Sequence, residues 1–470
     1  MPLDFAGWCT QARRDVMRNR FFLLVLVAAM LGRGTVQALW PRIVNGVATD
    51  QYPAVALVAF YSDATQSELA GLCSGALVGC HTVLTAGHCV CPDSADNYES
   101  CVAEGLADPG SIAVFLANVG VLPVRRVTLH PGYEFGNGND VSILELTEPA
   151  EGVPVLPLVT AKPADGSSGR VVGYGTTRSG FRSVDDTGIK REGLVVFGAC
   201  PSDVAADGNL CWNFTGSGAN ACSGDSGGAV VVQEGGRAVL AGVVSGGSTF
   251  DCQPPDQSFA TSIAAVRNWL VATGGSDVGA SCALPGSFGD GLVETYSVEL
   301  TAARPRAQME FDVPVRAAEL RVTFNGQSGS GTGLGAVDND FDLFLAPVEA
   351  ASREQWVCQD ERAENWGACR VPRPDAGRWR WELRRVVGSG PAQVTVTIFP
   401  GLPSCGGDCN RDGRVEVNEL VAAVNILLGI SSLENCSAAD ANSDGEVTVD
   451  EILLGVSAAL AGCEAVATTK

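Results

Sequence analysis

Cysteine restricts how this chain of 470 residues can fold more than any other residue, because the chain contains seventeen of them. Sixteen lie between Cys73 and Cys463, and Cys9 stands apart near the N-terminus. An even number of cysteines in an exported protein indicates a framework of disulfide bonds, whereas so many buried free thiols are unusual. The interpretation therefore depends on whether the chain is exported and whether Cys9 is removed.

Residues 1–38 have the layout of a secretory signal peptide. Arginines precede an apolar core at residues 21–31, and small residues follow up to Ala38. A membrane-spanning helix needs roughly 20 apolar residues, so we expect cleavage rather than anchoring. Cleavage would remove Cys9, leave an even number of cysteines and place the mature protein outside the cell.

Composition narrows the classes of function. Asp and Glu number 53 against 31 Lys and Arg, which gives a net charge of −22. Nucleic-acid binding needs a basic face, so no nucleic-acid partner is expected, whereas the excess of carboxylates suits cations, calcium above all. Hydrophobic residues make up 46% of the chain, enough to bury real cores, and the length favours about three domains.

Four regions follow a short segment at residues 39–42. Residues 43–274 contain short β-type runs separated by Gly, Pro and Asp, which favour an antiparallel barrel or sandwich, and end in a predicted helix. Residues 275–290 have the composition of a linker, residues 291–400 form a second block of alternating strands, and residues 401–470 contain a repeat. The predicted elements of the first region are Ala54–Phe60, Ala76–Val78, Val83–Thr85, Val141–Leu146, Val171–Gly173, Ala229–Val232, Leu240–Val244 and the helix Ile263–Leu270.

Three short segments of the first region carry groups that suit acyl transfer. A serine nucleophile needs a base that takes its proton and a carboxylate that orients the base. Glycines around the serine allow a tight turn that aims backbone N–H groups at an oxyanion. One such segment is a weak signal, but all three in this order predict a catalytic triad. The segments are Leu84–Cys89 with His88, Asn139–Leu146 with Asp140, and Ser223–Gly228 with Ser226.

These segments resemble the trypsin/chymotrypsin-like serine peptidases over residues 43–274. The resemblance implies a mainly β fold of two six-stranded antiparallel β-barrels with the active site in the cleft between them. It makes His88 the general base, Asp140 the residue that orients it, and Ser226 the nucleophile. The backbone N–H groups of Gly224 and Ser226 would form the oxyanion hole.

The resemblance also implies disulfide pairs. The family spacing joins Cys73 to Cys89, Cys200 to Cys211, and Cys222 to Cys252. Cys91 and Cys101 would close an insertion, and Cys358 and Cys369 suit a local pair in the second block. Cys80 and Cys282 could tie the linker to the first domain, but the sequence leaves their pairing open.

The start of the first region suggests activation by cleavage. Residues 39–42 would be a short propeptide that ends at Arg42, before Ile43-Val-Asn-Gly. In the family, cleavage before such a segment frees an α-ammonium group, which pairs with the aspartate before the nucleophile, here Asp225. Burying an unpaired carboxylate is unfavourable, so pairing would reorganise the oxyanion loop. Arg42 implies an activating protease of trypsin-like specificity; the alternative is a passive N-terminus.

The substrate pocket is predicted from the same spacing. Its floor falls six residues before Ser226, at Asn220, where a carboxylate would select Arg or Lys as in trypsin. Because Asn220 is neutral, we expect a medium-to-large apolar or neutral polar residue before the scissile bond, and doubtful self-cleavage at Arg42. Gly247 would leave one wall open, and Ser258 falls near the other.

Two further positions border this pocket. Ser245 falls where the family has a serine that hydrogen-bonds the catalytic carboxylate. Gly246 replaces the aromatic residue that usually follows it, so we expect a more open wall beside the substrate.

The second block resembles the pre-peptidase C-terminal domain of secreted bacterial proteases, a small β-sandwich. The resemblance rests on Asn339–Leu345, the pair Cys358 and Cys369, and Gly377–Leu383. A role in binding substrate or surfaces and a role as spacer or folding aid both fit. The acidic cluster Asp338, Asp340 and Asp342 could hold calcium or form a solvated loop.

The tail contains two copies of a calcium-loop pattern, at residues 408–419 and 440–451. Calcium takes roughly six to eight oxygens, from loop positions 1, 3, 5, 7 and 12, with glycine at position 6 for the turn. Both copies satisfy this pattern, position 7 through its backbone carbonyl, so we expect two structural calcium ions and no cofactor for catalysis. The candidate ligands are Asp408, Asn410, Asp412, Arg414, Glu419, Asp440, Asn442, Asp444, Glu446 and Glu451.

Each loop leads into one predicted helix, Leu420–Leu428 or Ile452–Leu460. Paired loop–helix repeats resemble dockerin modules, which implies calcium-dependent docking to a cohesin-like partner. The positions that usually contact cohesin, residues 417–418 and 449–450, depart from the family's hydroxyl pair. Four cysteines in the tail suggest a disulfide-stapled module.

The sequence thus supports two hypotheses. The first is a secreted serine endopeptidase of the zymogen type, activated by cleavage after Arg42, which hydrolyses proteins or peptides and carries a calcium-binding docking module. The second is a catalytically silent, peptidase-like adhesin or scaffold. The intact triad together with Asp225 favours the endopeptidase.

Overall fold

The computed structural model describes residues 43–66, 68–177, 186–249, 251–284, 287, 291–315, 317–328, 339–350, 355–401, 405–410, 412–441 and 445–463. The predicted signal peptide and propeptide, with Arg42, lie outside these residues. Over the described ranges, no helix is long and apolar enough to cross a membrane.

The first β-barrel is closed by six antiparallel strands in the order β2-β3-β4-β7-β6-β5. Its strands are short and largely buried because most of their side chains are Val, Ile, Leu or Ala and face one core. The strands are β2 (Val55–Tyr61), β3 (Leu69–Leu77), β4 (Thr82–Thr85), β5 (Ile112–Leu116), β6 (Gly120–Leu129) and β7 (Ser142–Leu146).

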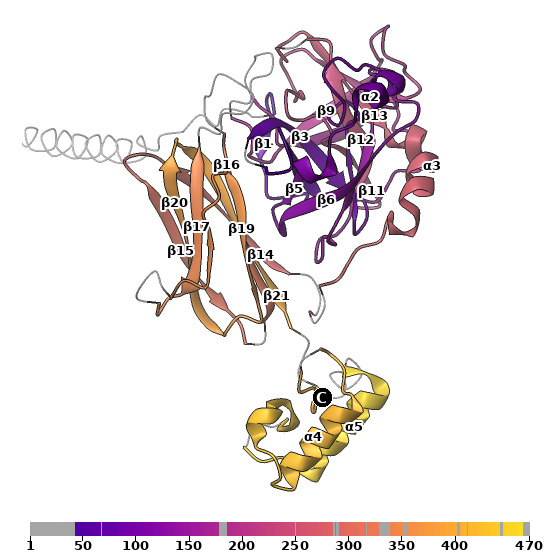
Figure 1. Cartoon of the computed structure of the whole chain (residues 1–470). Coiled ribbons are helices and arrows are strands. Elements are labelled where there is room, and N and C mark those ends of the chain that lie inside the picture. Colours follow the sequence, from indigo (N-terminus) through magenta and orange to yellow (C-terminus); the bar gives the residue numbers. More distant parts are fainter. Residues whose placement is uncertain are drawn as a thin grey trace, which may run out of the picture. The chain divides into compact units, whose positions relative to one another are not determined.

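The second barrel closes because β8 pairs with both β9 and β11. A short strand, β1 (Val47–Ala48), adds to β9 at its edge. The two closed barrels confirm the predicted chymotrypsin-like architecture of the first region (Figure 1). The six strands are β8 (Ser168–Gly173), β9 (Arg191–Gly198), β10 (Asn209–Phe214), β11 (Ala229–Glu234), β12 (Arg237–Gly247) and β13 (Asp256–Ser262).

Among the described residues of this region, α-helices occur at two places. Helix α2 (Tyr98–Glu104) lies within the insertion closed by Cys91 and Cys101, and Asn97 forms its capping box with Ser100. Helix α3 (Ile263–Gly274) follows β13, begins at the predicted residue and extends one turn beyond the predicted end. Short 3₁₀ turns occur at Pro109–Ser111 and Gly275–Asp277.

The second block folds into two four-stranded antiparallel sheets, drawn as two layers in Figure 1. Residues of both sheets share one hydrophobic cluster, to which Leu320, Leu343 and Trp381 belong. One sheet has the order β14 (Leu292–Leu300), β21 (Gly390–Pro400), β16 (Ala317–Gly326) and β19 (Trp366–Pro372); the other has the order β15 (Arg306–Val313), β20 (Gly377–Val387), β17 (Asp340–Pro347) and β18 (Cys358–Asp360).

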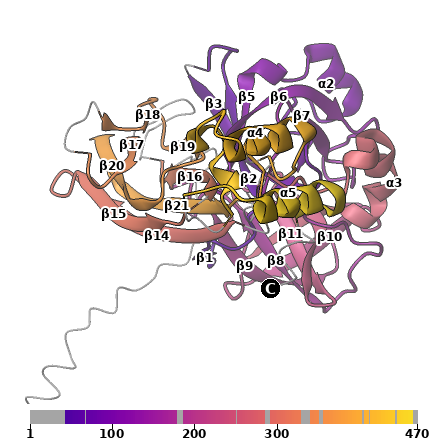
Figure 2. The same ribbon diagram turned by 90° about the horizontal axis from the view of Figure 1, so that it is seen from below.

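The described part of the tail has two main helices, α4 (Val417–Leu427) and α5 (Val449–Ala461), which lie side by side in both views (Figures 1 and 2). Both begin three residues before the predicted start. Capping boxes cause this shift, because Glu419 and Glu451 each accept the backbone N–H three residues earlier. Single 3₁₀ turns at Leu433–Asn435 and Ser437–Ala439 connect the two repeats.

Eight disulfide bonds join the sixteen cysteines that follow Cys9. Six of them are the pairs considered from the sequence, including the open one between Cys80 and Cys282. The tail adds two more, Cys405–Cys463 and Cys409–Cys436. Because Cys405 and Cys463 stand near the two ends of the tail, their bond closes this region on itself.

Candidate active site

The structure brings His88 and Asp140 into contact through two hydrogen bonds. His88 follows β4, and Asp140 lies just before the paired strand β7. The backbone N–H of His88 donates to Oδ1 of Asp140 and ring atom Nδ1 lies against Oδ2, both over 2.8 Å. Ser245 Oγ donates to the same Oδ2 over 2.5 Å, as predicted. The carboxylate thus fixes both the position and the tautomer of the imidazole, and Nε2 is left for another partner.

Electrostatics favour the ionised form of Asp140. Burial raises the pKa of Asp140, but the opposing charge and hydrogen bonds of His88, with the hydroxyl of Ser245, hold it below its ordinary value. Burial also lowers the pKa of His88, whereas the charge and hydrogen bond of Asp140 raise it further than burial lowers it. The net result is an imidazole with a raised pKa beside a buried carboxylate.

The backbone around Ser226 presents two unused N–H groups. Those of Asp225, Gly227 and Gly228 donate to backbone carbonyls. Within the described ranges, the N–H groups of Gly224 and Ser226 have no protein acceptor. Gly224 has a φ of +88°, a conformation that suits glycine.

Ser74 holds this loop from the first barrel. Its Oγ donates to the carbonyl of Gly224 over 2.8 Å, and its backbone N–H donates to the carbonyl of Ser226 over 2.7 Å. These two bonds attach the nucleophile loop to strand β3 of the first barrel. Ser74 was not singled out in the sequence, and only the packing of the two barrels reveals it.

His88, Gly224 and Ser226 line one surface cavity of about 740 Å³. No hydrogen bond joins the side chains of His88 and Ser226 among the residues that the structure describes; such bonds are often long without substrate and tighten in the complex. An acyl group in this cavity could meet a hydroxyl, an imidazole and a pair of N–H donors together.

Asp225 is buried among polar backbone groups. It accepts the N–H of Gly175 over 2.8 Å and that of Cys222 over 3.0 Å. Burial raises its pKa to about 7, and no basic side chain of the described residues lies within ion-pair distance. Ile43 is fully buried, and Val44 pairs with Asn220. The residue after Ile43 thus pairs with the segment that leads to Asp225, while Arg42 is not described.

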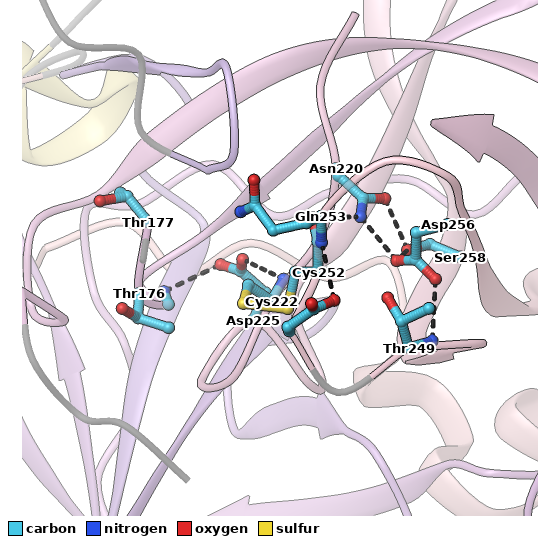
Figure 3. The surroundings of a disulfide bond; sticks show 12 residues. Thr176, Thr177, Asn220, Cys222, Asp225, Thr249, Cys252, Gln253, Asp256 and Ser258 are labelled. Atoms are coloured by element: carbon cyan, nitrogen blue, oxygen red, sulfur yellow. Dashed lines mark hydrogen bonds between the residues drawn. A yellow bond between two sulfur atoms is a disulfide. The ribbon is translucent and has the colours of Figure 1, made fainter. Parts of the chain in front are cut away.

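Asn220, at the predicted floor position, has an acidic neighbour. Asn220 is fully buried, and its Nδ2 donates to Oδ2 of Asp256 over 2.7 Å. Figure 3 shows both side chains beside the disulfide Cys222–Cys252, pointing toward each other. The prediction of a neutral floor considered Asn220 alone and did not include the carboxylate of Asp256 next to it.

Neutral groups surround the Asp256 carboxylate. Ser258 Oγ donates to Oδ1 of Asn220 over 2.7 Å, while Ser248 Oγ and the Thr249 N–H donate to Oδ1 of Asp256. A side chain at Gly247 would begin 3.1 Å from this carboxylate. No described cation pairs with Asp256, and its carboxylate lies against the backbone of Gly247.

The wall beside Gly246 is filled, contrary to the expected opening. A Cβ at this position would lie 2.9 Å from the ring of Phe259 and 3.0 Å from the ring of Phe135. The Phe135 ring also stands edge-on to His88, with centroids 5.5 Å apart. Phe135 thus provides from the first barrel the aromatic surface that position 246 lacks.

The calcium-loop residues are described in part, since Asn442 and Asp444 lie outside the described residues. In the first loop, Asp408 accepts the N–H of Gly413 and Glu419 accepts that of Asn410, each over 2.9 Å. Asp440 accepts the N–H of Gly445 likewise. No group of three or more His, Cys, Asp or Glu side chains is placed to hold a metal in the described parts of the chain.

The donor set nevertheless fits calcium. In the first loop Asp408 and Glu419 are nearly fully buried carboxylates, and no described basic side chain pairs with Glu419. Gly413 has a φ of +85°, and Gly445 of +90°, which the sharp turn of a calcium loop requires. The backbone N–H of Arg414 donates to the side-chain Oδ1 of Asp412 within the same loop, while Glu446 is exposed and Glu451 caps α5.

The second-block acidic cluster is also only partly described, because Asp338 lies outside the described residues. Burial raises the pKa of Asp340, and burial together with the charges of Asp340 and Glu361 raises that of Asp342 to about 6. These two residues are strand positions of β17.

Comparison with known proteins agrees with this geometry. Residues 43–270 match the trypsin family. Trypsin zeta of Drosophila erecta is 29% identical over 249 residues, which cover 49% of this chain and 84% of that protein. Trypsin alpha of Drosophila melanogaster is 28% identical over 270 residues, covering 54% and 97%. Residues 43–270 are therefore a trypsin-like serine peptidase domain.

Among solved structures, neuropsin, a serine protease expressed in the limbic system of mouse brain, is 23% identical. The match covers 47% of this chain and 95% of neuropsin, with a TM-score of 0.37.

Proposed function

We propose that this protein is a secreted serine endopeptidase that hydrolyses peptide bonds through an acyl-enzyme. The observation that carries the proposal is the pair of hydrogen bonds from His88 to Asp140, beside two unused N–H groups at Gly224 and Ser226. These are a base with its orienting carboxylate and a pair of oxyanion donors. All of them border one cavity or pack directly behind it.

The reaction follows from the positions of these groups. Ser226 Oγ attacks the carbonyl carbon of the scissile bond while Nε2 of His88 takes the hydroxyl proton of Ser226. The oxyanion that forms accepts hydrogen bonds from the two N–H groups. His88 then donates the proton to the leaving amine, and the C–N bond breaks. Water then attacks the acyl-enzyme while His88 takes its proton. The ester bond to Ser226 breaks, and the carboxylic acid product is released. Asp140 stabilises the imidazolium in both steps.

Activation is proposed to follow cleavage after Arg42 by another protease or by a second copy. Asp225 is buried, has a raised pKa and lacks a described cationic partner, while Ile43 is buried nearby in the same domain. A new α-ammonium group at Ile43 would supply the missing charge. Pairing would ionise Asp225 and fix the adjoining N–H groups of Gly224 and Ser226.

The substrate class is proposed from the pocket floor. Asp256 is 3% exposed, accepts only neutral donors among the described residues, and lies beside Asn220 at the floor position. A buried carboxylate without a cation favours a ligand that brings one. We therefore propose Arg or Lys before the scissile bond, which also makes Arg42 a possible site of self-activation.

The remaining regions are assigned by resemblance. The residues of the tail loops suit two structural calcium ions, and the loop–helix repeats suit docking to a cohesin-like partner. The two four-stranded sheets suit a pre-peptidase C-terminal domain. Extracellular location agrees with eight disulfide bonds and with the signal-like N-terminus.

The proposed activity is tested with an organophosphonate probe. Protein cleaved before Ile43 should react with the probe at Ser226, as peptide mass spectrometry can show, and should hydrolyse a denatured protein substrate. Ser226→Ala should lose both, since loss of a triad member costs about 10⁴- to 10⁶-fold in rate. An unlabelled wild-type protein that leaves substrate intact would favour the silent scaffold.

A further inference from the structure

Strand β16 of the second block carries buried polar side chains at alternate positions. Leu320, Val322 and Phe324 point into the core of the two sheets. Arg321, Thr323 and Asn325, on the opposite face, are exposed by no more than 2%. In a sheet with one solvated face these positions would be wet, so something covers them.

The peptidase domain covers this face of β16. One Arg321 Nη1 donates to the carbonyls of Asn118 and Glu151, over 3.3 and 2.7 Å. Thr323 Oγ1 donates to the carbonyl of Ala117. These acceptors lie in connections of the first barrel, remote in sequence from the nucleophile. They attach the second block to the peptidase domain without touching the oxyanion loop.

The end of β16 makes a different contact. Asn325 Nδ2 donates to the carbonyl of Gly188 over 2.9 Å, and the backbone N–H of Ser328 donates to the carbonyl of Thr187 over 2.9 Å. The hydroxyls of Ser328 and Thr187 are 2.6 Å apart. Gly188 permits this approach, because its φ is +93° and a Cβ there would lie 2.4 Å from the carbonyl of Gly326.

Residues 187–188 pack directly behind the oxyanion donors. A Cβ at Gly224 would lie 3.4 Å from Cγ2 of Thr187, and Thr187 lines the same cavity as His88 and Ser226. The N–H of Gly188 donates to the carbonyl of Tyr174 over 2.9 Å. The second block therefore reaches the catalytic cavity through one intervening residue.

A second set of bonds continues from this contact to the nucleophile loop. The N–H of Gly175 donates to Asp225, and the N–H of Thr176 donates to the carbonyl of Ser223 over 2.8 Å. Buried Arg191 ties the two sides together, since one Nη1 donates to the carbonyls of Gly175, Asp186 and Ile189. Residues 174–176 and 186–191 thus act as a bracket around Ser223–Asp225.

We propose that the second block is a built-in positioning element for the oxyanion hole, with Asn325 and Ser328 as its positioning residues. They act through Thr187 and Gly188, which they hold against Gly224. The inference rests on the proposed peptidase activity for its kinetic consequence. Its structural consequence, an oxyanion loop restrained by the second block, can be measured separately.

The test compares four substitutions in the full-length, activated protein. Asn325→Ala and Ser328→Ala each remove side-chain contacts to the bracket. Thr323→Val is the matched control, because it removes a hydrogen bond to the peptidase domain from the same face of the same strand. Ser328→Thr restores the hydroxyl and serves as the rescue.

Asn325→Ala with Ser328→Ala should lower kcat roughly 10- to 100-fold with KM changed less than threefold, because misplacement of about 1 Å at the donors has this effect. Amide hydrogen exchange should quicken in peptides that cover residues 174–176 and 223–228. Thr323→Val should change neither, and Ser328→Thr should recover most of the rate lost in Ser328→Ala.

Three results would distinguish failure of the proposed peptidase activity from failure of the positioning role. If the wild type hydrolyses nothing and takes up no probe at Ser226, the proposed activity fails, and exchange alone then decides whether the bracket is restrained. Unchanged kcat and exchange in the double variant of an active enzyme would overturn the positioning role. An equal loss of kcat in Thr323→Val would reduce the contact to ordinary domain packing and overturn it as well.

Discussion

Asn220 donates from its side-chain amide to the carboxylate of Asp256 over 2.7 Å, in a site where neither residue is exposed by more than 3%. The two are 36 residues apart in the chain. Asn220 belongs to the segment that leads to Ser226, whereas Asp256 opens strand β13. The carboxylate beside the predicted floor position thus belongs to a residue outside the nucleophile motif.

Replacing Asp256 should remove the preference for basic substrates. We expect Asp256→Asn to lower kcat/KM for peptides with Arg or Lys before the scissile bond by about 30- to 1,000-fold, the equivalent of roughly 2–4 kcal/mol for a lost buried charge pair. Peptides with Leu or Gln at that position should change little. Paired fluorogenic substrates measure both.

Ser258→Ala is the matched control for this prediction. It removes the hydrogen bond to Asn220 but keeps the Asp256 charge, so the ratio of basic to neutral substrates should stay within a few-fold of wild type. A wild-type enzyme that cleaves after neutral residues, as mapped by mass spectrometry of digested proteins, would contradict the assignment of Asp256.

The sequence could predict that His88, Asp140 and Ser226 share one site, but not that Asp256 and Phe135 lie near it. His88, Asp140 and Ser226 each sit in a short local motif, and the order of the motifs along the chain carries the signal. Asp256 and Phe135 reach the pocket only through tertiary packing, from β13 and from the connection before β7. Counting residues from Ser226 along the chain therefore cannot predict either contact.

The alternating pattern at residues 319–324 also predicts the local structure but not the tertiary contacts. It correctly predicts a strand, now β16, because every second residue faces the sheet core. The polar residues between them are expected to face water, but Arg321 and Thr323 are buried against the peptidase domain. Periodicity reports which residues share a face and not what covers that face.

The pH dependence of hydrolysis should report the charge of Asp140. This carboxylate raises the pKa of His88, and the base must be neutral to act, so kcat/KM should fall as pH drops through that raised value. Asp140→Asn should move the acid limb to lower pH, because the charge is gone, and lower the rate about 10⁴-fold. pH profiles of kcat/KM provide the measurement.

Ser245→Ala serves as the control for the pH profile. It removes one hydrogen bond to Asp140 but keeps the charge, so the acid limb should stay near that of wild type and the rate should fall far less. An acid limb that stays fixed in Asp140→Asn would contradict the coupling of the two residues.

Stability of the uncut protein should depend on Asp225. Its pKa is about 7 when folded and about 3.9 when unfolded, so the folded state holds a proton that the unfolded state releases between these values. The free energy of unfolding therefore falls as pH rises from about 4 to 7, by at most roughly 4 kcal/mol. Calorimetry of uncut Arg42→Gln protein should show this as a falling Tm.

Two comparisons isolate the contribution of Asp225. In the same uncut background, Asp225→Asn should reduce the fall of Tm, because the titrating group is absent. Cleavage before Ile43 should reduce it too, because an ammonium partner favours the ionised carboxylate at neutral pH. Full hydrolytic activity in uncut Arg42→Gln protein would contradict the activation scheme altogether.

The tail should bind two calcium ions, and binding should stabilise it without changing hydrolysis. Ligands that bind only the folded state stabilise by RT ln(1 + [L]/Kd), so millimolar calcium should raise the Tm of the tail transition in the full-length protein. Asp412→Ala with Asp444→Ala should abolish the rise, because each removes a side-chain ligand.

Arg414→Ala with Glu446→Ala is the control, since position 7 binds through its backbone carbonyl. The disulfides Cys405–Cys463 and Cys409–Cys436 hold the tail together without metal, which limits the size of the rise. Titration calorimetry that detects no calcium binding would refute both the ion sites and the docking role that depends on them.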